Sequence, residues 1–189
     1  MTLWLISDTH FSHASMIFTF KLANGEPARN FNSVEEMDEL MIENWNACVK
    51  ISDHVYHVGD VAMTQHALDT VMPRLHGHKR LVRGNHDICK TKHYARYFKE
   101  IYGVRVLDQL IMSHYPIHPE SLKEGWINVH GHTHMNHVRL PDMTRDTRYV
   151  NICVEQTGYR PITLEEARAG KWHLTSVKGR YRNESVDDV

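Results

Sequence analysis

The chain has 189 residues, 41% of them hydrophobic and 24% charged, values that fit one soluble globular domain and exclude a largely disordered or membrane-inserted chain. The formal net charge of −1 supplies no overall basic field, so nucleic acid stays open as a partner without being indicated. The three cysteines lack C-x-x-C spacing, and we find no signal or membrane-spanning segment, so we expect reduced thiols, a cytoplasmic location and no membrane partner.

The first half of the chain alternates expected strands with expected helices. Residues 2–7 form a short apolar run that predicts a buried strand. Ser33 and Glu36 have the spacing of a helix-capping box, and apolar residues at helical spacing predict a long amphipathic helix after them. We expect two further strands at 53–60 and 79–87 and two further helices at 64–75 and 92–102.

The second half is richer in strands. We expect one or two strands within 104–116 and single strands at 126–134 and 148–155. Thr163 and Glu166 repeat the capping-box spacing and predict a short helix that ends at Gly170. No repeat or linker divides the chain, so the pattern predicts one α/β sandwich domain over residues 1–175 and a polar tail at 176–189.

Residues that commonly bind metals follow the predicted strands. They are Asp8, His10, Asp60, Asn85, His86, His114, His132 and His134. Because ligand sites in α/β sheets gather at the carboxyl ends of strands, we expect these loops to converge. Carboxylate and imidazole ligands without thiolates suit Mn²⁺, Fe²⁺, Zn²⁺ or Ni²⁺. The set is too large for one ion with open positions, whereas two neighbouring ions would leave one imidazole for proton transfer.

The same residues form an ordered set of motifs, "DTH", "GD", "GNHD", "SH" and "GHTH", between residues 8 and 134. This pattern resembles the calcineurin-like metallophosphoesterases, and the later "VNICVE" is similar to small bacterial and phage members. The resemblance implies a four-layer α/β/β/α sandwich. It also implies a metal-dependent hydrolase that acts on a phosphoester substrate. The sequence does not indicate an oligomeric state.

The resemblance further implies a role for each motif residue. Asp8, His10, Asp60 and His134 would bind the first metal, and Asp60, Asn85, His114 and His132 the second, with Asp60 bridging. Mn²⁺ is the favoured ion for both positions, with Fe, Zn and Ni as alternatives. A hydroxide that bridges the metals would attack phosphorus in line, and protonated His86 would assist the departing oxygen.

Several neighbouring residues are left without a firm role. His13 and Asp87 are expected either to support the site or to belong to its loops, and His118, His130 and His137 to support the site or the fold. Arg29, Arg83 and Arg139 are candidates to clamp phosphate, but arginines are more often solvated surface residues, so we assign none of them. We expect a shallow site whose specificity comes from segments 13–32 and 115–125.

Three alternatives remain beside this interpretation. "HTHMNH" is similar to the metal motif of metallo-β-lactamase-like enzymes, but Asn136 replaces the ligand aspartate and the other motifs stay unexplained. The same fold also serves as a non-enzymatic scaffold in members that lack catalytic histidines. Among the metallophosphoesterases, protein phosphatases continue "GD" with an acid and an arginine. Met63 and Thr64 stand there in this chain, which disfavours a protein phosphatase. Without an assigned basic clamp, we favour a phosphodiesterase over a phosphomonoesterase.

Overall fold

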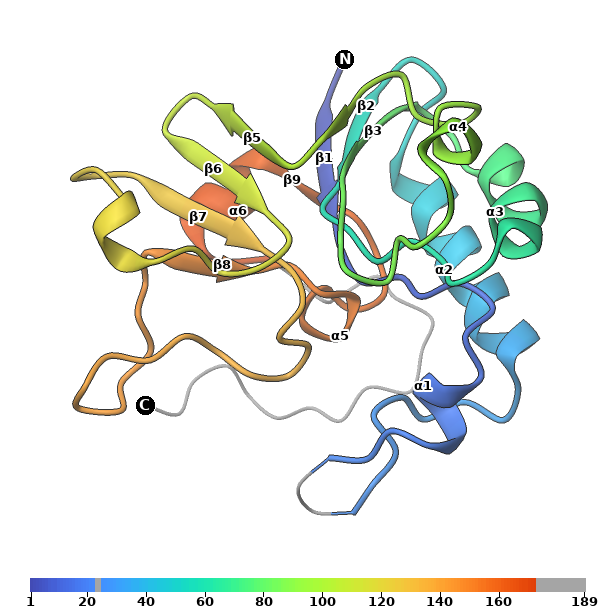
Figure 1. Ribbon diagram of the computed structural model, residues 1–189, viewed down its shortest axis with the longest axis horizontal. Coiled ribbons are helices and arrows are strands. Elements are labelled where there is room, and N and C mark those ends of the chain that lie inside the picture. The colour runs from blue at the N-terminus through green and yellow to red at the C-terminus, as the bar shows by residue number, and fades with distance from the viewer. Residues whose placement is uncertain (23–24, 173–189) are drawn as a thin grey trace.

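Two β-sheets form the centre of the molecule, and the computed structural model describes residues 1–22 and 25–172 (Figure 1). The first sheet has the strand order β4-β3-β2-β1-β9, at Ile101–Tyr102, His78–Val82, His54–His57, Leu3–Ile6 and Ile162–Thr163. Strands β1 to β4 are parallel, and β9 pairs with β1 in the antiparallel direction.

The second sheet has the strand order β5-β6-β7-β8, at Val104–Leu107, Leu110–Ser113, Ile127–His130 and Tyr149–Asn151. Strands β6, β7 and β8 are parallel, whereas β5 and β6 form an antiparallel hairpin. The hairpin turns at Asp108 and Gln109, which both have a positive φ. The segment 104–116 therefore holds two strands, the larger of the numbers expected.

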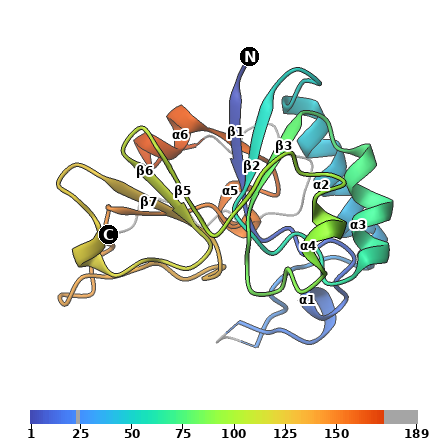
Figure 2. The same ribbon diagram turned by 45° about the horizontal axis from the view of Figure 1, so that its top comes forward.

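Three helices cover the outer face of the first sheet (Figures 1 and 2). They are α2 at Val34–Cys48, α3 at Gln65–Val71, which continues as a 3-10 turn at Met72–Arg74, and α4 at Thr91–Tyr94. Met37 and Trp45 of α2 pack with Leu68 of α3 against Val55 and Leu81 of the sheet. The buried Trp45 ring also donates a hydrogen bond through Nε1 to the carbonyl of His76. Burial of these side chains is the main stabilising term for this half.

A second core lies between the two sheets. Leu5 and Val82 of the first sheet pack with Met112 and Val129 of the second. Helix α6, at Leu164–Ala169, adds the buried Ala167 to the same core. The chain is thus a mixed α/β fold with two sheets packed face to face and helices around them.

Both capping residues expected from the sequence cap helices. The Ser33 hydroxyl accepts a hydrogen bond from the backbone N–H of Glu36, at 3.1 Å, at the start of α2. Thr163 and Glu166 form a complete capping box at α6, which ends at Gly170 in the left-handed region. Local hydrogen bonding therefore determines where these two helices begin, as the sequence predicts.

The prediction of a helix over residues 92–102 is wrong. Only Thr91–Tyr94 is helical, while Ile101–Tyr102 form β4 and pair with Leu81 and Val82 of β3. Tertiary pairing with the edge of the sheet overrides the helical spacing of the apolar residues. The strand expected at 148–155 likewise ends at Asn151, and helix α5 takes Val154–Thr157. Two further single turns, α1 at Ser15–Phe18 and a 3-10 turn at Pro119–Ser121, are not expected from the sequence.

The carboxyl ends of the parallel strands in both sheets meet at one edge. Ser7 follows β1 and forms an isolated parallel bridge with Cys153, which follows β8. The backbone N–H of Val154 donates to the carbonyl of Ser7 at 3.1 Å, and that of Gly131 donates to the carbonyl of His114 at 3.0 Å. Loops from both sheets therefore surround a common region.

The polar tail expected at 176–189 lies outside the described residues. In the described ranges, no helix combines the length and apolar character needed to cross a membrane.

We expect His57 at the end of β2 to make the folded protein sensitive to acid. It is 1% exposed, its Nε2 lies 2.9 Å from the Thr9 hydroxyl, and burial lowers its pKa to about 3. The unfolded chain, with a histidine pKa of about 6.5, therefore takes up the proton first as the pH falls. The free energy of unfolding should decrease below pH ~6.5, by up to ~1.4 kcal/mol per pH unit from this residue.

We expect His57→Gln to reduce this pH dependence, because glutamine does not titrate and its amide can still reach Thr9. Urea unfolding of both proteins in chelator at pH 7.5 and pH 5.5 measures the effect. Equal losses of stability between the two pH values would show that His57 is not the acid-sensitive group.

Candidate metal centre

All eight residues predicted for the site lie at the common edge of the two sheets. The Asp8 and Asp60 carboxylates are its buried centre, at 0% and 1% exposed. Burial raises the pKa of Asp8, because a charged carboxylate is disfavoured away from water. A bound cation would compensate the charge of this buried carboxylate, so Asp8 fits a metal ion.

One group of ligands surrounds Asp8. The His10 Nε2 atom lies 3.8 Å from Asp8 Oδ1 and 3.5 Å from Asp60 Oδ2, and the His134 Nε2 atom lies 3.8 Å from Asp8 Oδ1. His10 Nε2 is buried and makes no hydrogen bond with any part of the chain that the structure describes. A buried imidazole nitrogen that faces two carboxylates in this way is suited to a metal ion.

The second group surrounds Asn85. The His114 Nε2 atom lies 3.2 Å from Asp60 Oδ2 and 2.9 Å from Asn85 Oδ1, and the His132 Nδ1 atom lies 3.1 Å from Asn85 Oδ1. Asp60 Oδ2 therefore faces both groups, through His10 and through His114. The Asp60 Oδ1 atom instead accepts a hydrogen bond from the backbone N–H of His86 at 2.8 Å.

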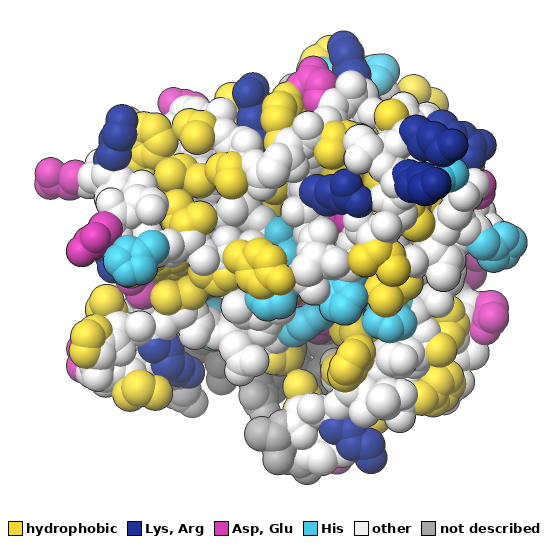
Figure 3. All heavy atoms as spheres, viewed as in Figure 1, with side chains coloured by type: hydrophobic (Ala, Val, Ile, Leu, Met, Phe, Trp, Pro, Cys, Tyr) yellow, Lys and Arg dark blue, Asp and Glu magenta, His cyan; other side chains and the backbone are white. Residues whose placement is uncertain are grey.

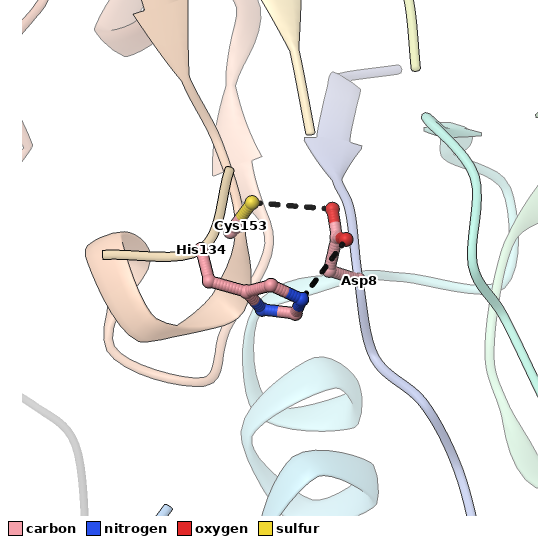
Figure 4. Close-up of side chains that lie close together, drawn as sticks. All are labelled: Asp8, His134 and Cys153. Atoms are coloured by element: carbon pink, nitrogen blue, oxygen red, sulfur yellow. Dashed lines mark hydrogen bonds and ion pairs between the residues drawn. The ribbon is translucent and has the colours of Figure 1, made fainter. Parts of the chain in front are cut away.

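Cys153 is a site residue that the sequence does not reveal. Its Sγ lies 3.2 Å from Asp8 Oδ2, and Asp8, His134 and Cys153 form a compact group of possible ligands (Figure 4). Burial raises the pKa of this thiol well above its usual value, so it stays protonated and donates to Asp8. The Ser7 hydroxyl donates to the same oxygen at 2.6 Å, which leaves Oδ1 facing the histidines.

Five of the predicted residues have a left-handed backbone that residues other than glycine seldom adopt. Their φ values are 57° at Asp8, 48° at His10, 57° at Asp60, 66° at His132 and 48° at His134. Aspartate and histidine tolerate this region better than most residues, but each instance still costs about 1–3 kcal/mol. Surrounding contacts must maintain these turns, which direct the side chains into one volume.

Two motif glycines allow the loops to approach the carboxylates. A Cβ on Gly131 would lie 2.2 Å from Asp8 Oδ2, and a Cβ on Gly84 would lie 2.3 Å from Asp60 Oδ1. Neither carboxylate oxygen can move away without leaving the centre. The glycines of "GNHD" and "GHTH" are therefore required by close packing.

Asp87 supports the loops around Asp60. Its carboxylate accepts hydrogen bonds from the backbone N–H groups of Asp60, Val61 and Gly84, at 2.8 to 3.0 Å. Burial raises the pKa of Asp87 to about 6. Of the two roles considered from the sequence, the structure favours support of the site.

Arg29 and Glu155 form a buried ion pair beside the centre, and neither is assigned from the sequence. Arg29 is 1% exposed, and its Nε and Nη2 atoms each lie 2.8 Å from Glu155 Oε1. The same carboxylate oxygen lies 3.0 Å from His134 Nδ1, which directs His134 Nε2 toward Asp8. Burial alone would raise the pKa of Glu155, but Arg29 and His134 lower it to about 2.

Arg29 also connects this pair to the loop that follows β1. Its Nη1 donates to the Thr9 carbonyl at 2.7 Å, and its Nη2 donates to the Asp8 carbonyl at 2.5 Å. Arg29, from the loop between α1 and α2, thereby fixes the backbone at the left-handed Asp8 and at Thr9.

The remaining histidines near the motifs have different positions. His13 Nδ1 lies 3.2 Å from His10 Nδ1, so His13 contacts a predicted ligand. His130 is fully buried, and its Nδ1 lies 2.8 Å from the Gly131 carbonyl. His118 accepts from the backbone N–H of Glu120 at 3.4 Å and caps a 3-10 turn.

The family model described as calcineurin-like phosphoesterase matches residues 1–178. The chain belongs to this family. Membership supports a metal-dependent phosphoester hydrolase with phosphoester substrates, and the ligand groups described above are consistent with it.

Proteins similar to this chain include one from an archaeon and one from a phage. An uncharacterized protein of Methanocaldococcus jannaschii is 34% identical over 172 residues, which cover 86% of this chain and 87% of the relative. The gene 66 protein of Mycobacterium phage L5 is 27% identical over 167 residues, with 69% and 76% covered. A crystal structure of a protein of unknown function from Aquifex aeolicus has a TM-score of 0.66 and 27% identity, with 87% and 96% covered.

We expect Arg29→Met to lower the free energy of unfolding by about 3–5 kcal/mol, because it leaves the Glu155 carboxylate buried without its cation. The double variant Arg29→Met/Glu155→Gln should recover part of this loss. Urea unfolding of the three proteins in chelator measures both effects. A single variant as stable as the parent would contradict the structural role given to this ion pair.

Proposed function

We propose that this protein is a phosphodiesterase that uses two divalent metal ions. The observation that best supports two ions is the position of Asp60 Oδ2, which lies 3.5 Å from His10 Nε2 and 3.2 Å from His114 Nε2. A carboxylate can serve two cations at once, and here Asp60 lies between one group that contains Asp8 and another that contains the neutral amide of Asn85.

Each group has the composition of one metal site. Asp8, His10, Asp60 and His134 would hold the first ion, and Asp60, Asn85, His114 and His132 the second. Oxygen and imidazole donors of this kind suit Mn²⁺, our first choice, as well as Fe, Zn and Ni. Bound ions would supply a water molecule of lowered pKa and would neutralise charge on the phosphoryl oxygens.

His86 is the residue proposed to transfer a proton. Its ring centroid lies 5.3 Å from that of His10 and 6.3 Å from that of His13. The hydrogen bond from its backbone to Asp60 Oδ1 fixes its place beside the centre, while its own imidazole belongs to neither ligand group. Protonated His86 would donate to the oxygen of the leaving group.

The contacts of the arginines support a diester substrate. Arg29 is occupied by Glu155 and two carbonyls, Arg83 donates to the carbonyls of Asp87 and Cys89, and Arg139 donates to that of Met143. A monoester carries an additional negative charge that a free cation beside the site would stabilise. The guanidinium groups of all three arginines considered as phosphate clamps are thus occupied by other parts of the chain.

We also propose that the two sheets and their helices form the four-layer α/β/β/α sandwich expected from the sequence.

Metal-dependent turnover tests the proposal. Protein stripped with chelator should be inactive, and Mn²⁺ should restore hydrolysis of bis-p-nitrophenyl phosphate faster than that of p-nitrophenyl phosphate. Faster hydrolysis of the monoester would contradict the diester preference. Failure to cleave either compound with any divalent ion would contradict the proposal that the protein is a phosphoester hydrolase.

Two substitutions should separate metal binding from proton transfer. We expect His86→Ala to keep both ions and to lower kcat by ~10²–10⁴, because it removes a general acid. Asp60→Asn should lose bound metal, because an amide cannot replace a bridging carboxylate. Metal content by mass spectrometry and steady-state kinetics measure these outcomes, with His66→Ala on the exposed face of α3 as the matched control. Loss of metal from His86→Ala would mean that His86 is a ligand.

A further inference from the structure

An exposed aromatic ring lies against the second ligand group. Tyr115 directly follows His114 and is 50% exposed. Its ring centroid lies 4.2 Å from that of His132 and 5.4 Å from that of His114. Figure 3 shows several histidines in a row near the centre of this face, with hydrophobic side chains beside them.

The ring is held by contacts with imidazoles rather than by a polar partner. Among the described residues, the Tyr115 hydroxyl takes part in no hydrogen bond, although the Tyr115 carbonyl accepts one from Ser113 at 2.7 Å. The ring therefore packs on His132, while Tyr115 as a residue is half exposed to solvent beside the proposed metal site. Such a surface offers stacking area to a planar group of a bound molecule.

The two proposed groups of ligands distinguish two sides of the site. His86 lies beside His10 and His13 at the first group, whereas Tyr115 lies beside His114 and His132 at the second. If His86 serves the leaving group, the ester group that remains on phosphorus is the one available to Tyr115.

We propose that Tyr115 forms a subsite for a planar aromatic ester group on the non-leaving side of a phosphodiester. This inference rests on the proposed phosphodiesterase function. In the reaction, water adds to phosphorus, the P–O bond to the leaving group breaks, and the departing oxygen takes a proton. The aromatic group at Tyr115 remains on the product monoester.

Two substrates with the same leaving group test this subsite. Phenyl p-nitrophenyl phosphate and ethyl p-nitrophenyl phosphate both release p-nitrophenol and differ only in the group that stays on phosphorus. The quantity to compare is the ratio of their kcat/KM values with the Mn²⁺-loaded enzyme. A general loss of activity affects both esters and cancels in this ratio.

We expect the phenyl-to-ethyl ratio to fall about tenfold in Tyr115→Ala, as loss of an aromatic stacking contact predicts. Tyr115→Phe keeps the ring and should keep the ratio of the parent. Tyr115→Leu keeps a large side chain beside His132 and should have the low ratio of Tyr115→Ala.

A parent ratio in Tyr115→Ala or Tyr115→Leu, with both esters still hydrolysed, would overturn the subsite and leave the phosphodiesterase in place. Failure of the parent protein to hydrolyse either ester with any divalent ion would overturn the proposed function, and the subsite with it.

Discussion

The arrangement of the site depends on the contacts of the Asp60 carboxylate. Asp60 lies at the end of β2 in a left-handed turn, and its Oδ2 faces one imidazole from the first sheet and one from the second. Its Oδ1 is occupied by the backbone of His86, and three amides of the adjoining loops are held by Asp87. Imidazoles from both sheets therefore meet at one carboxylate oxygen, and a bound cation would be the largest local charge there.

The strained turns around this carboxylate are stabilised by buried charge. Arg29 reaches from the loop before α2 to the carbonyls of Asp8 and Thr9, and its charge is matched by Glu155 at the start of α5. Glu155 in turn orients His134. An ion pair taken out of water contributes little net stability by itself, but loss of either partner is costly. We interpret its role as the fixation of ligand geometry.

Much of the site could be predicted because its residues follow strands, and the carboxyl ends of parallel strands meet. Asp8, Asp60 and His114 are recognisable in this way from local apolar runs. Arg29 and Glu155 are not, since a lone arginine in a loop is more often solvated, and their pairing spans 126 positions. Prediction of the fold has the same limit. Ser33 and Thr163 mark the starts of helices, because capping is a local interaction. Strand β4 at Ile101–Tyr102 instead forms by pairing with the edge of β3, which the local spacing of residues does not encode.

In the proposed dinuclear site, Asp60 lies between two metal ions. Anomalous diffraction from crystals grown with Mn²⁺ tests it directly. We expect two peaks, one on each side of the Asp60 carboxylate. Asp8, His10 and His134 should surround the first peak, and Asn85, His114 and His132 the second. A single peak among Asp8, His134 and Cys153, with none beside Asn85, would contradict it.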